Sequence, residues 1–176
     1  MFGKFKKGNK NKRGDLMRQQ TKVIVHNTSW FSLGQKAKGK PFQFFVIEDM
    51  FELRQIVQDA IVMMDGAIAG YAESCDEIIH KLKPVKSIVD VITMDINLGK
   101  MNSLSMIPVI KEMAPQAKIV IVSANPTESN VKRALFELNV HHFLVKPFSH
   151  EDFCETFAHV LGTNTGYLAD VFRATE

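Results

Sequence analysis

Short runs of consecutive apolar residues alternate with stretches of helical periodicity from Phe42 onward. A run that is apolar at every position is typical of a strand buried on both faces, whereas apolar residues recurring every three or four positions indicate a helix packed on one side. Five strands are predicted at 43–47, 67–72, 89–94, 118–122 and 142–145. Helices are predicted after them at about 53–64, 75–82, 104–113, 128–138 and 150–161, the last capped by Ser149.

Five strand–helix units joined by short connections predict one α/β domain, a parallel sheet with helices on both faces. We assign it to residues 41–162, between a basic, largely disordered extension at 1–40 and a short tail at 163–176. Within the extension, 22–32 is more apolar and is predicted to form a short strand or a docking segment. In parallel sheets of this kind the chemistry gathers at the carboxyl ends of the strands.

The net charge of +3 hides two oppositely charged parts of the chain. Residues 1–40 hold eleven Lys and Arg against one acid, for +10, and the remaining residues hold eleven against eighteen acids, for −7. A basic segment without a folded groove gives only salt-sensitive, non-specific affinity, so no specific nucleic-acid binding is expected. A solvated tail, a contact with an acidic partner and binding to an anionic membrane remain open for it.

Cys75 and Cys154 lie far apart without metal-ligand spacing, and the sequence contains no secretion signal and no transmembrane run. This combination predicts reduced thiols and a cytoplasmic protein without a transmembrane segment. About fifteen residues follow the last predicted helix, too few for a DNA-binding or catalytic domain. Any output is therefore expected from the α/β domain itself.

Residues that can carry chemistry directly follow four of the five predicted strands. Glu48 and Asp49 follow the first strand, Asp95 the third, Ser123 the fourth and Lys146 the fifth. Clustered carboxylates repel one another and favour a hard cation with oxygen ligands, of which Mg²⁺ is expected here. A carboxylate nucleophile beside such an ion can accept a phosphoryl group, whose oxygens the hydroxyl and the ammonium group can hold.

Each of these residues alone has an ordinary explanation. A strand-end acid such as Asp49 commonly favours the start of the following helix, and a single Lys146 is commonly a solvated charge. Five such residues in register at successive strand ends are not expected by chance. The set as a whole therefore predicts one phosphorylation site.

Four stretches of the chain resemble the motifs of one family. They are IEDMFELRQIV at 47–57, MDINLGKMNSL at 94–104, IVIVSAN at 119–125 and FLVKPF at 143–148. With these motifs in this order, residues 42 to about 161 resemble the CheY-like receiver domain of two-component response regulators. The resemblance implies a flavodoxin-like (βα)5 fold, a doubly wound parallel sheet with strand order 2-1-3-4-5.

The resemblance implies that Asp95 is the phosphoacceptor and that Ser123 and Lys146 are the catalytic hydroxyl and amine. In this family the phosphoryl group draws the hydroxyl residue inward, and an aromatic residue rotates into the vacated space. Ser123 and Phe143 stand at these switch positions, although core packing is an equal interpretation of Phe143. A cis peptide bond is expected at Lys146–Pro147.

Mg²⁺ is the cofactor that the resemblance implies. Its expected protein ligands are the carboxylates of Asp49 and Asp95 and the main-chain carbonyl of Asn97, with Glu48 assisting through water. Asn97 and Asn125 match the positions that flank the attacking water in hydrolysis of the acyl phosphate. Neither is a carboxylate, so unexceptional autodephosphorylation is expected.

The chain departs from the family pattern at several positions. Glu48 replaces the first residue of the usual Asp-Asp pair. Gly99 replaces a frequent proline, which predicts a more mobile loop after the phosphoacceptor. Pro108 falls early in the third predicted helix and is expected to bend it, and Asn102-Ser103 stands where Asp-Gly is common.

The leading hypothesis is a stand-alone receiver domain, phosphorylated by a histidine kinase or a phosphotransfer protein and, by analogy, acting in chemotaxis or motility. It is not expected to turn over an external substrate. Its output surface is expected on the fourth helix, fifth strand and fifth helix, which include Val131, Ala134, His141, His142 and the exposed side of 153–159. Because neighbours on a strand point to opposite faces, His141 and His142 predict one buried and one exposed imidazole rather than a metal site.

Three other functions compete with this hypothesis. A pseudo-receiver or adaptor would bind partners without phosphorylation, which Glu48, Gly99 and the basic extension leave open. A phosphatase with an aspartyl nucleophile would carry a D-x-D motif after the first strand, where this chain has Glu48-Asp49-Met50. A flavodoxin would carry a Ser/Thr/Gly-rich phosphate loop after that strand, and the sequence has none.

Overall fold

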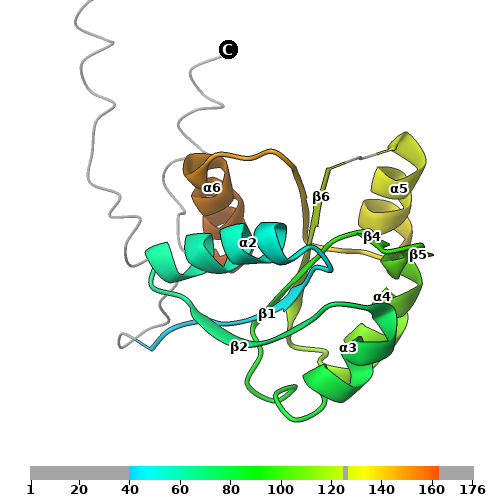
Figure 1. The fold of residues 1–176 in the computed structure, drawn as a ribbon, viewed down its shortest axis with the longest axis horizontal. Helices are drawn as coiled ribbons and strands as arrows, with labels where there is room; N and C mark the ends of the chain where they lie inside the picture. The colour runs from blue at the N-terminus through cyan, green and yellow to red at the C-terminus, as the bar shows by residue number, and fades with distance from the viewer. Residues whose placement is uncertain (1–39, 125–126, 163–176) are drawn as a thin grey trace, which may run out of the picture.

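A five-stranded parallel sheet forms the centre of the protein, with the order β2-β1-β3-β6-β7 (Figure 1). The computed structural model describes residues 40–124 and 127–162, so the basic extension with its segment 22–32, Asn125 and the tail 163–176 lie outside the described residues. The order confirms the predicted fold, since these strands are the five expected ones. They are β1 (Gln43–Ile47), β2 (Ala67–Ala72), β3 (Val91–Met94), β6 (Lys118–Ser123) and β7 (His142–Val145).

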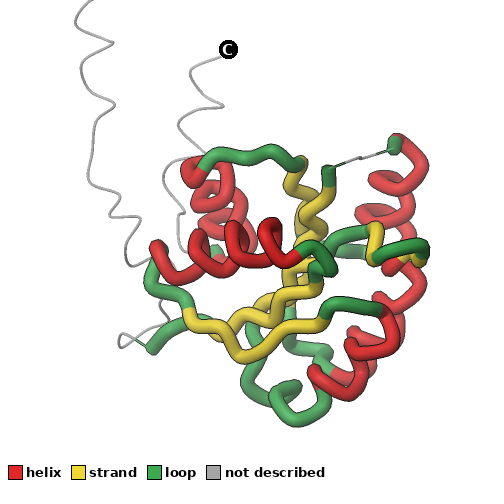
Figure 2. Tube along the Cα trace, in the orientation of Figure 1, coloured by secondary structure: helices red, strands yellow, loops and turns green. Residues whose placement is uncertain are grey.

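Helices cover both faces of this sheet (Figures 1 and 2). One face carries α2 (Phe51–Met63) and α6 (His150–Leu161), and the other carries α3 (Cys75–Leu82), α4 (Ile107–Met113) and α5 (Glu128–Lys132). In the described residues no helix is both long and apolar enough to cross a bilayer.

The apolar run of β1 supplies both layers of the core. Phe44 and Val46 pack into the cluster beneath α2 and α6, and Phe45 and Ile47 pack into the cluster beneath α3, α4 and α5. Successive side chains of a strand point to opposite faces, and all four are at most 1% exposed. The prediction of a strand buried on both sides is therefore confirmed.

Helix α6 is defined at both ends by its own sequence. Ser149 and Asp152 form a capping box at the start, and Gly162 ends the helix with a φ of 67°. Between these ends, the ring of Phe157 packs against the rings of Phe153 and Phe44, with centroids 4.5 and 5.4 Å apart. The helix is thereby fixed against β1.

Two details of the predicted helices are wrong. Ile56 was expected on the inner stripe of α2 but is 52% exposed, and Arg54 takes a buried place instead. The third predicted helix is divided into a 3-10 segment, Ser103–Met106, and α4. Pro108 lies in the first turn of α4, where the amide needs no partner within the helix, so it begins this helix rather than bending it.

Two further features were not predicted at all. A small antiparallel hairpin follows β3 and consists of β4 (Asn97–Leu98) and β5 (Met101–Asn102). Helix α5 continues as a π-helix over Arg133–Glu137. The π-helix places Ala134 inside the core, fully buried, so the expectation that Ala134 belongs to the output surface is wrong.

We predict that Phe157→Ala lowers the free energy of unfolding by about 4 kcal/mol, because it removes a buried ring and leaves a cavity between α6 and β1. Phe136→Ala is the matched control, since its ring is 80% exposed, and it should change stability by less than about 0.5 kcal/mol. Urea unfolding followed by circular dichroism measures both. Equal effects of the two substitutions would contradict the described packing of α6.

Candidate functional site

Lys146 lies between two carboxylates at the carboxyl ends of the strands. Its Nζ donates to Oδ2 of Asp95 at 2.8 Å and also to Oε2 of Glu48. Glu48 is 1% exposed, and Asp95 and Lys146 are each 8% exposed. The structure thus brings together three of the predicted site residues, which follow β1, β3 and β7, and it contains the expected cis bond at Lys146–Pro147.

This group carries a net negative charge in a place shielded from water. Burial raises the pKa of Glu48 above its ordinary value, and the hydrogen bond and charge of Lys146 partly offset that rise. A buried carboxylate costs free energy unless it is paired, and one ammonium group serves two carboxylates here. Additional positive charge at this end of the sheet is therefore favoured.

Asp49 belongs to the same edge of the sheet but has a different partner. Its Oδ2 accepts a hydrogen bond from the main-chain N–H of Gly99 at 2.8 Å. The N–H of Asn97 donates to Oδ1 of Asp95 at 3.2 Å. The β4–β5 hairpin thus contacts both carboxylates, and greater mobility of this loop because of Gly99 stays a prediction.

Ser123 ends β6, beside the strand that leads to Lys146. Its Cα pairs with that of Val145 in the sheet, and its carbonyl accepts from the N–H of Lys146 at 2.9 Å. The Oγ of Ser123 is buried and has no hydrogen-bond partner within residues 40–124 and 127–162. A buried hydroxyl without a partner costs about 1–3 kcal/mol, so it is available to a ligand oxygen.

The donors at this edge fit a small hard cation. Among the described residues no three His, Cys, Asp or Glu side chains surround a common point as metal ligands. Mg²⁺ does not need such a cage, because it keeps several waters and uses only one or two carboxylates. Asp49 and Asp95, both contacted by one hairpin, can supply that number.

Comparison with known proteins matches most of the described domain, including its strand-end residues, to one family. The family model described as the response regulator receiver domain matches residues 44–158. The chain belongs to this family.

Named relatives of this receiver domain agree with the family. The chain is 36% identical to the chemotaxis protein CheY of Treponema pallidum over 130 residues, which are 73% of this chain and 88% of that protein. It is 32% identical to CheY of Thermotoga maritima, over 58% of this chain and 83% of that protein. Among solved structures, the CheX-CheY-BeF3-Mg²⁺ complex from Borrelia burgdorferi has a chain that matches with a TM-score of 0.67 and 25% identity, covering 74% of this chain and 98% of that one.

Phe143 lies on β7 of the receiver domain, half-buried against the core cluster beneath α3, α4 and α5. In this structure Phe143 is therefore part of the core packing, as one of the two interpretations expected. A switching role remains a prediction.

Sequence reasoning missed two residues that support the site. Arg54 is 4% exposed, and its Nη1 donates to the main-chain carbonyl of Glu48 at 2.9 Å. Its Nη2 lies 2.7 Å from a carboxylate oxygen of Glu73, and its guanidinium stacks 4.8 Å from the ring centroid of Tyr71. Arg54 precedes the buried Val57 by three positions, so helical spacing could have revealed it.

The second residue is Ser103, which is fully buried. Its hydroxyl donates to the main-chain carbonyl of Asp95. No sequence signal points to this contact, because a serine at this position differs from the family pattern without indicating which carbonyl its hydroxyl meets.

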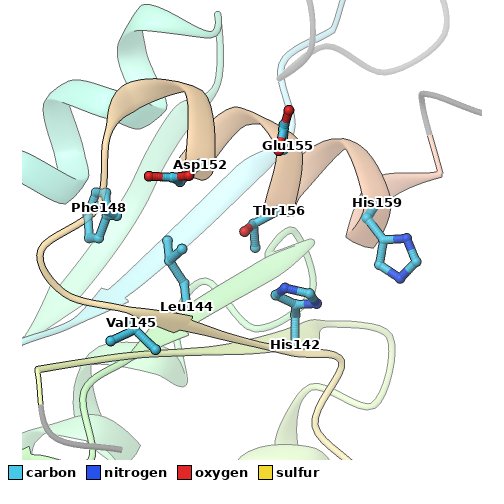
Figure 3. A pocket seen from close by; sticks show the side chains of 8 residues that line it. All are labelled: His142, Leu144, Val145, Phe148, Asp152, Glu155, Thr156 and His159. Atoms are coloured by element: carbon cyan, nitrogen blue, oxygen red, sulfur yellow. The ribbon is translucent and has the colours of Figure 1, made fainter. Parts of the chain in front are cut away.

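A pocket of about 510 Å³ lies between β7 and α6 (Figure 3). His142 and Leu144 line it from the strand, and Thr156 and His159 line it from the helix. His142 is half-buried with its ring centroid 5.8 Å from that of His159, whereas His141 is exposed. We expected one buried and one exposed imidazole, and the structure agrees that His142 is the more buried of the two. His142 is, however, only half-buried.

The pocket generates a prediction about pH. Burial, followed by the nearby His159, lowers the pKa of His142. Below about pH 6.5 the unfolded chain takes up a proton that the folded protein resists, so stability falls as the pH drops toward the folded-state pKa. We expect His142→Phe to weaken the loss of stability between pH 7 and pH 5.5.

Chemical unfolding at several pH values measures this dependence. Part of the pH dependence of stability should remain in the His142→Phe variant, because burial also lowers the pKa of His141. An unchanged slope in His142→Phe would mean that His142 is not responsible.

Proposed function

We propose that this receiver domain accepts a phosphoryl group on Asp95 from a histidine kinase or a phosphotransfer protein. The observation that supports it most is the bond of Lys146 to Asp95 at 2.8 Å, together with the buried hydroxyl of Ser123 on the intervening strand, which has no hydrogen-bond partner among the described residues. One carboxylate thereby has an amine within reach and a hydroxyl on the neighbouring strand. These are the groups that a phosphoryl acceptor requires.

The reaction is a displacement at phosphorus. A carboxylate oxygen of Asp95 attacks, the new P–O bond replaces the P–N bond to the donor imidazole, and the imidazole leaves. Lys146 then donates from its Nζ to a phosphoryl oxygen, and the Ser123 hydroxyl donates to another. Asp49, Asp95 and the carbonyl of Asn97 would hold Mg²⁺, with Glu48 assisting through water, and the bound ion supplies positive charge beside the phosphoryl oxygens.

Ser123 also offers a way to transmit the signal. A hydroxyl without a partner gains a hydrogen bond when a phosphoryl oxygen arrives, which favours an inward position of Ser123 in the phosphorylated state. Movement of Ser123 would leave space that Phe143, half-buried on the neighbouring strand β7, can enter. The phosphorylation is thereby coupled to the surface around β7.

An apolar surface beside Lys146 suits a protein donor. Leu53, Ile56, Pro147 and Phe148 line a small pocket together with Lys146, and Ile56 is 52% exposed. Exposed apolar side chains next to a reactive group are typical of a docking site. We place the contact with the kinase or phosphotransfer protein here.

We propose that the output surface consists of α5, β7 and α6, and the pocket of Figure 3 lies between the last two of these elements. The relatives named chemotaxis protein CheY support a role in chemotaxis or motility. Asp95 is a phosphoacceptor in this proposal, and the protein turns over no external substrate.

We expect incubation with Mg²⁺ and a small phosphodonor such as acetyl phosphate to label the protein with an acid-stable, base-labile phosphoryl group. Asp95→Asn removes the nucleophile and should abolish the labelling. Asp59→Asn, a change at an exposed acid on α2, is the matched control and should be labelled like the wild type. Absence of labelling in all three proteins would favour an adaptor that acts without phosphorylation.

Replacing Ser123 tests the coupling. Ser123→Ala removes a buried hydroxyl that has no partner in the part of the chain that the structure describes, so it should raise the free energy of unfolding by about 1 kcal/mol. It should still be labelled, but the ring resonances of Phe143 should shift less on phosphorylation than in the wild type. Ser129→Ala, at an exposed position on α5, serves as the control for both measurements. Equal Phe143 shifts in all proteins would rule out the coupling through Ser123.

A further inference from the structure

The β4–β5 hairpin and the residue that follows it, Ser103, make three hydrogen bonds to the acidic residues of the site. The N–H of Gly99 donates to Asp49 Oδ2 at 2.8 Å, and the N–H of Asn97 donates to Asp95 Oδ1 at 3.2 Å. The hydroxyl of Ser103 donates to the main-chain carbonyl of Asp95. A segment of seven residues, 97–103, therefore contacts acids from two different strand ends.

We propose that residues 97–103 form a clamp that holds the Asp49 and Asp95 carboxylates in position for the divalent cation. In this clamp Gly99 and Ser103 are positioning residues. The inference rests on the proposed function, because it concerns the ion that phosphorylation of Asp95 needs.

Ser103 closes the base of the clamp. Its N–H donates to the carbonyl of Ile96 at 2.8 Å, and its hydroxyl donates to the carbonyl of Asp95. Ser103 is fully buried, so water cannot replace these bonds in the folded protein. Loss of the hydroxyl leaves a buried carbonyl without this donor and loosens the main chain of Asp95.

Gly99 forms the tip of the clamp that reaches Asp49. Its φ of 59° lies in the left-handed region, which orients the chain at the turn, while a Cβ at this position would meet nothing within 4 Å. The backbone conformation and the N–H, rather than lack of space, are therefore what matters at Gly99. A carboxylate has two oxygens, so Asp49 can keep this bond on one and bind an ion with the other.

The clamp also contains Asn97, whose carbonyl is the third protein ligand of the proposed Mg²⁺ site. The three protein ligands are thus held by one small hydrogen-bonded unit before the ion binds. A ligand set held in place before binding loses less freedom when the ion arrives. Weakening the clamp should raise the Mg²⁺ concentration needed for half-saturation and leave the chemistry at saturating Mg²⁺ nearly unchanged.

The first test needs neither phosphorylation nor metal. Amide hydrogen exchange in the Mg²⁺-free protein, followed by NMR, should be slower at Gly99 than at Lys100 in the same exposed turn. Ser103→Ala should speed exchange at Gly99. Equal exchange of Gly99 and Lys100 in the wild type would overturn the clamp, whatever the protein does with phosphate.

The second test measures Mg²⁺ itself, by NMR titration and by the Mg²⁺ dependence of labelling. Ser103→Ala should raise the half-saturating concentration about fivefold, the effect expected from one buried hydrogen bond. Ser105→Ala is a matched control, because the Ser105 hydroxyl also donates to a main-chain carbonyl, that of Asn102 at 3.1 Å, but on the exposed side. It should change the half-saturating concentration by less than twofold.

A pair of changes at Gly99 separates the N–H from the backbone conformation. Gly99→Asn keeps the N–H and tolerates a left-handed φ, so it should bind Mg²⁺ nearly as the wild type does. Gly99→Pro has no N–H and cannot adopt that φ, so it should weaken binding at least as much as Ser103→Ala.

The outcomes distinguish the two proposals. Slow exchange at Gly99 without any Mg²⁺ binding by the wild type would preserve the hydrogen-bonded clamp and contradict the proposed function. Mg²⁺ binding that is unchanged in Ser103→Ala and Gly99→Pro would overturn the positioning role while the proposed function stands. A lower labelling rate at saturating Mg²⁺, with an unchanged half-saturating concentration, would also overturn it.

Discussion

The arrangement of this site depends on the pairing of one buried ammonium group with two buried carboxylates. Lys146 joins Glu48 and Asp95, which without it would be two negative charges close together and shielded from water. Burial still raises the pKa of Glu48, so the compensation is incomplete. A site with residual negative charge, an ammonium group and a hydroxyl that no other described residue bonds is suited to a cation and an anion that arrive together.

The strand order makes this pairing possible. β1 and β3 are neighbours, which places Glu48 and Asp95 side by side, and β6 lies between β3 and β7. Ser123, at the end of β6, therefore stands between the strand of the acid and the strand of the amine. The long side chain of Lys146 reaches past β6 to Asp95, whereas the short side chain of Ser123 remains buried in between.

Residues around these strand ends hold the loops that carry the acids. Arg54 fixes the main chain of Glu48 from α2, and the segment 97–103 contacts Asp49 and Asp95. Two positions that depart from the family pattern, Gly99 and Ser103, supply hydrogen bonds to the site. Glycine permits many backbone conformations, which is why Gly99 predicts a mobile loop from the sequence. Its main-chain N–H is also a hydrogen-bond donor, and only the fold decides which acceptor it meets.

The sequence by itself determined the five strands of the central sheet, the alternation of these strands with helices and the acids at the strand ends, because apolar runs and helical periodicity reflect burial directly. Helical spacing could have placed Arg54 on the inner face of α2, but only the tertiary structure decided its partners, the carbonyl of Glu48 and the carboxylate of Glu73, which come from the loops after β1 and β2. The same holds for the hairpin, whose contacts with Asp49 join positions fifty residues apart. A hydrogen bond between distant segments leaves no periodic trace in the chain, so it becomes visible only when the fold brings its two ends together.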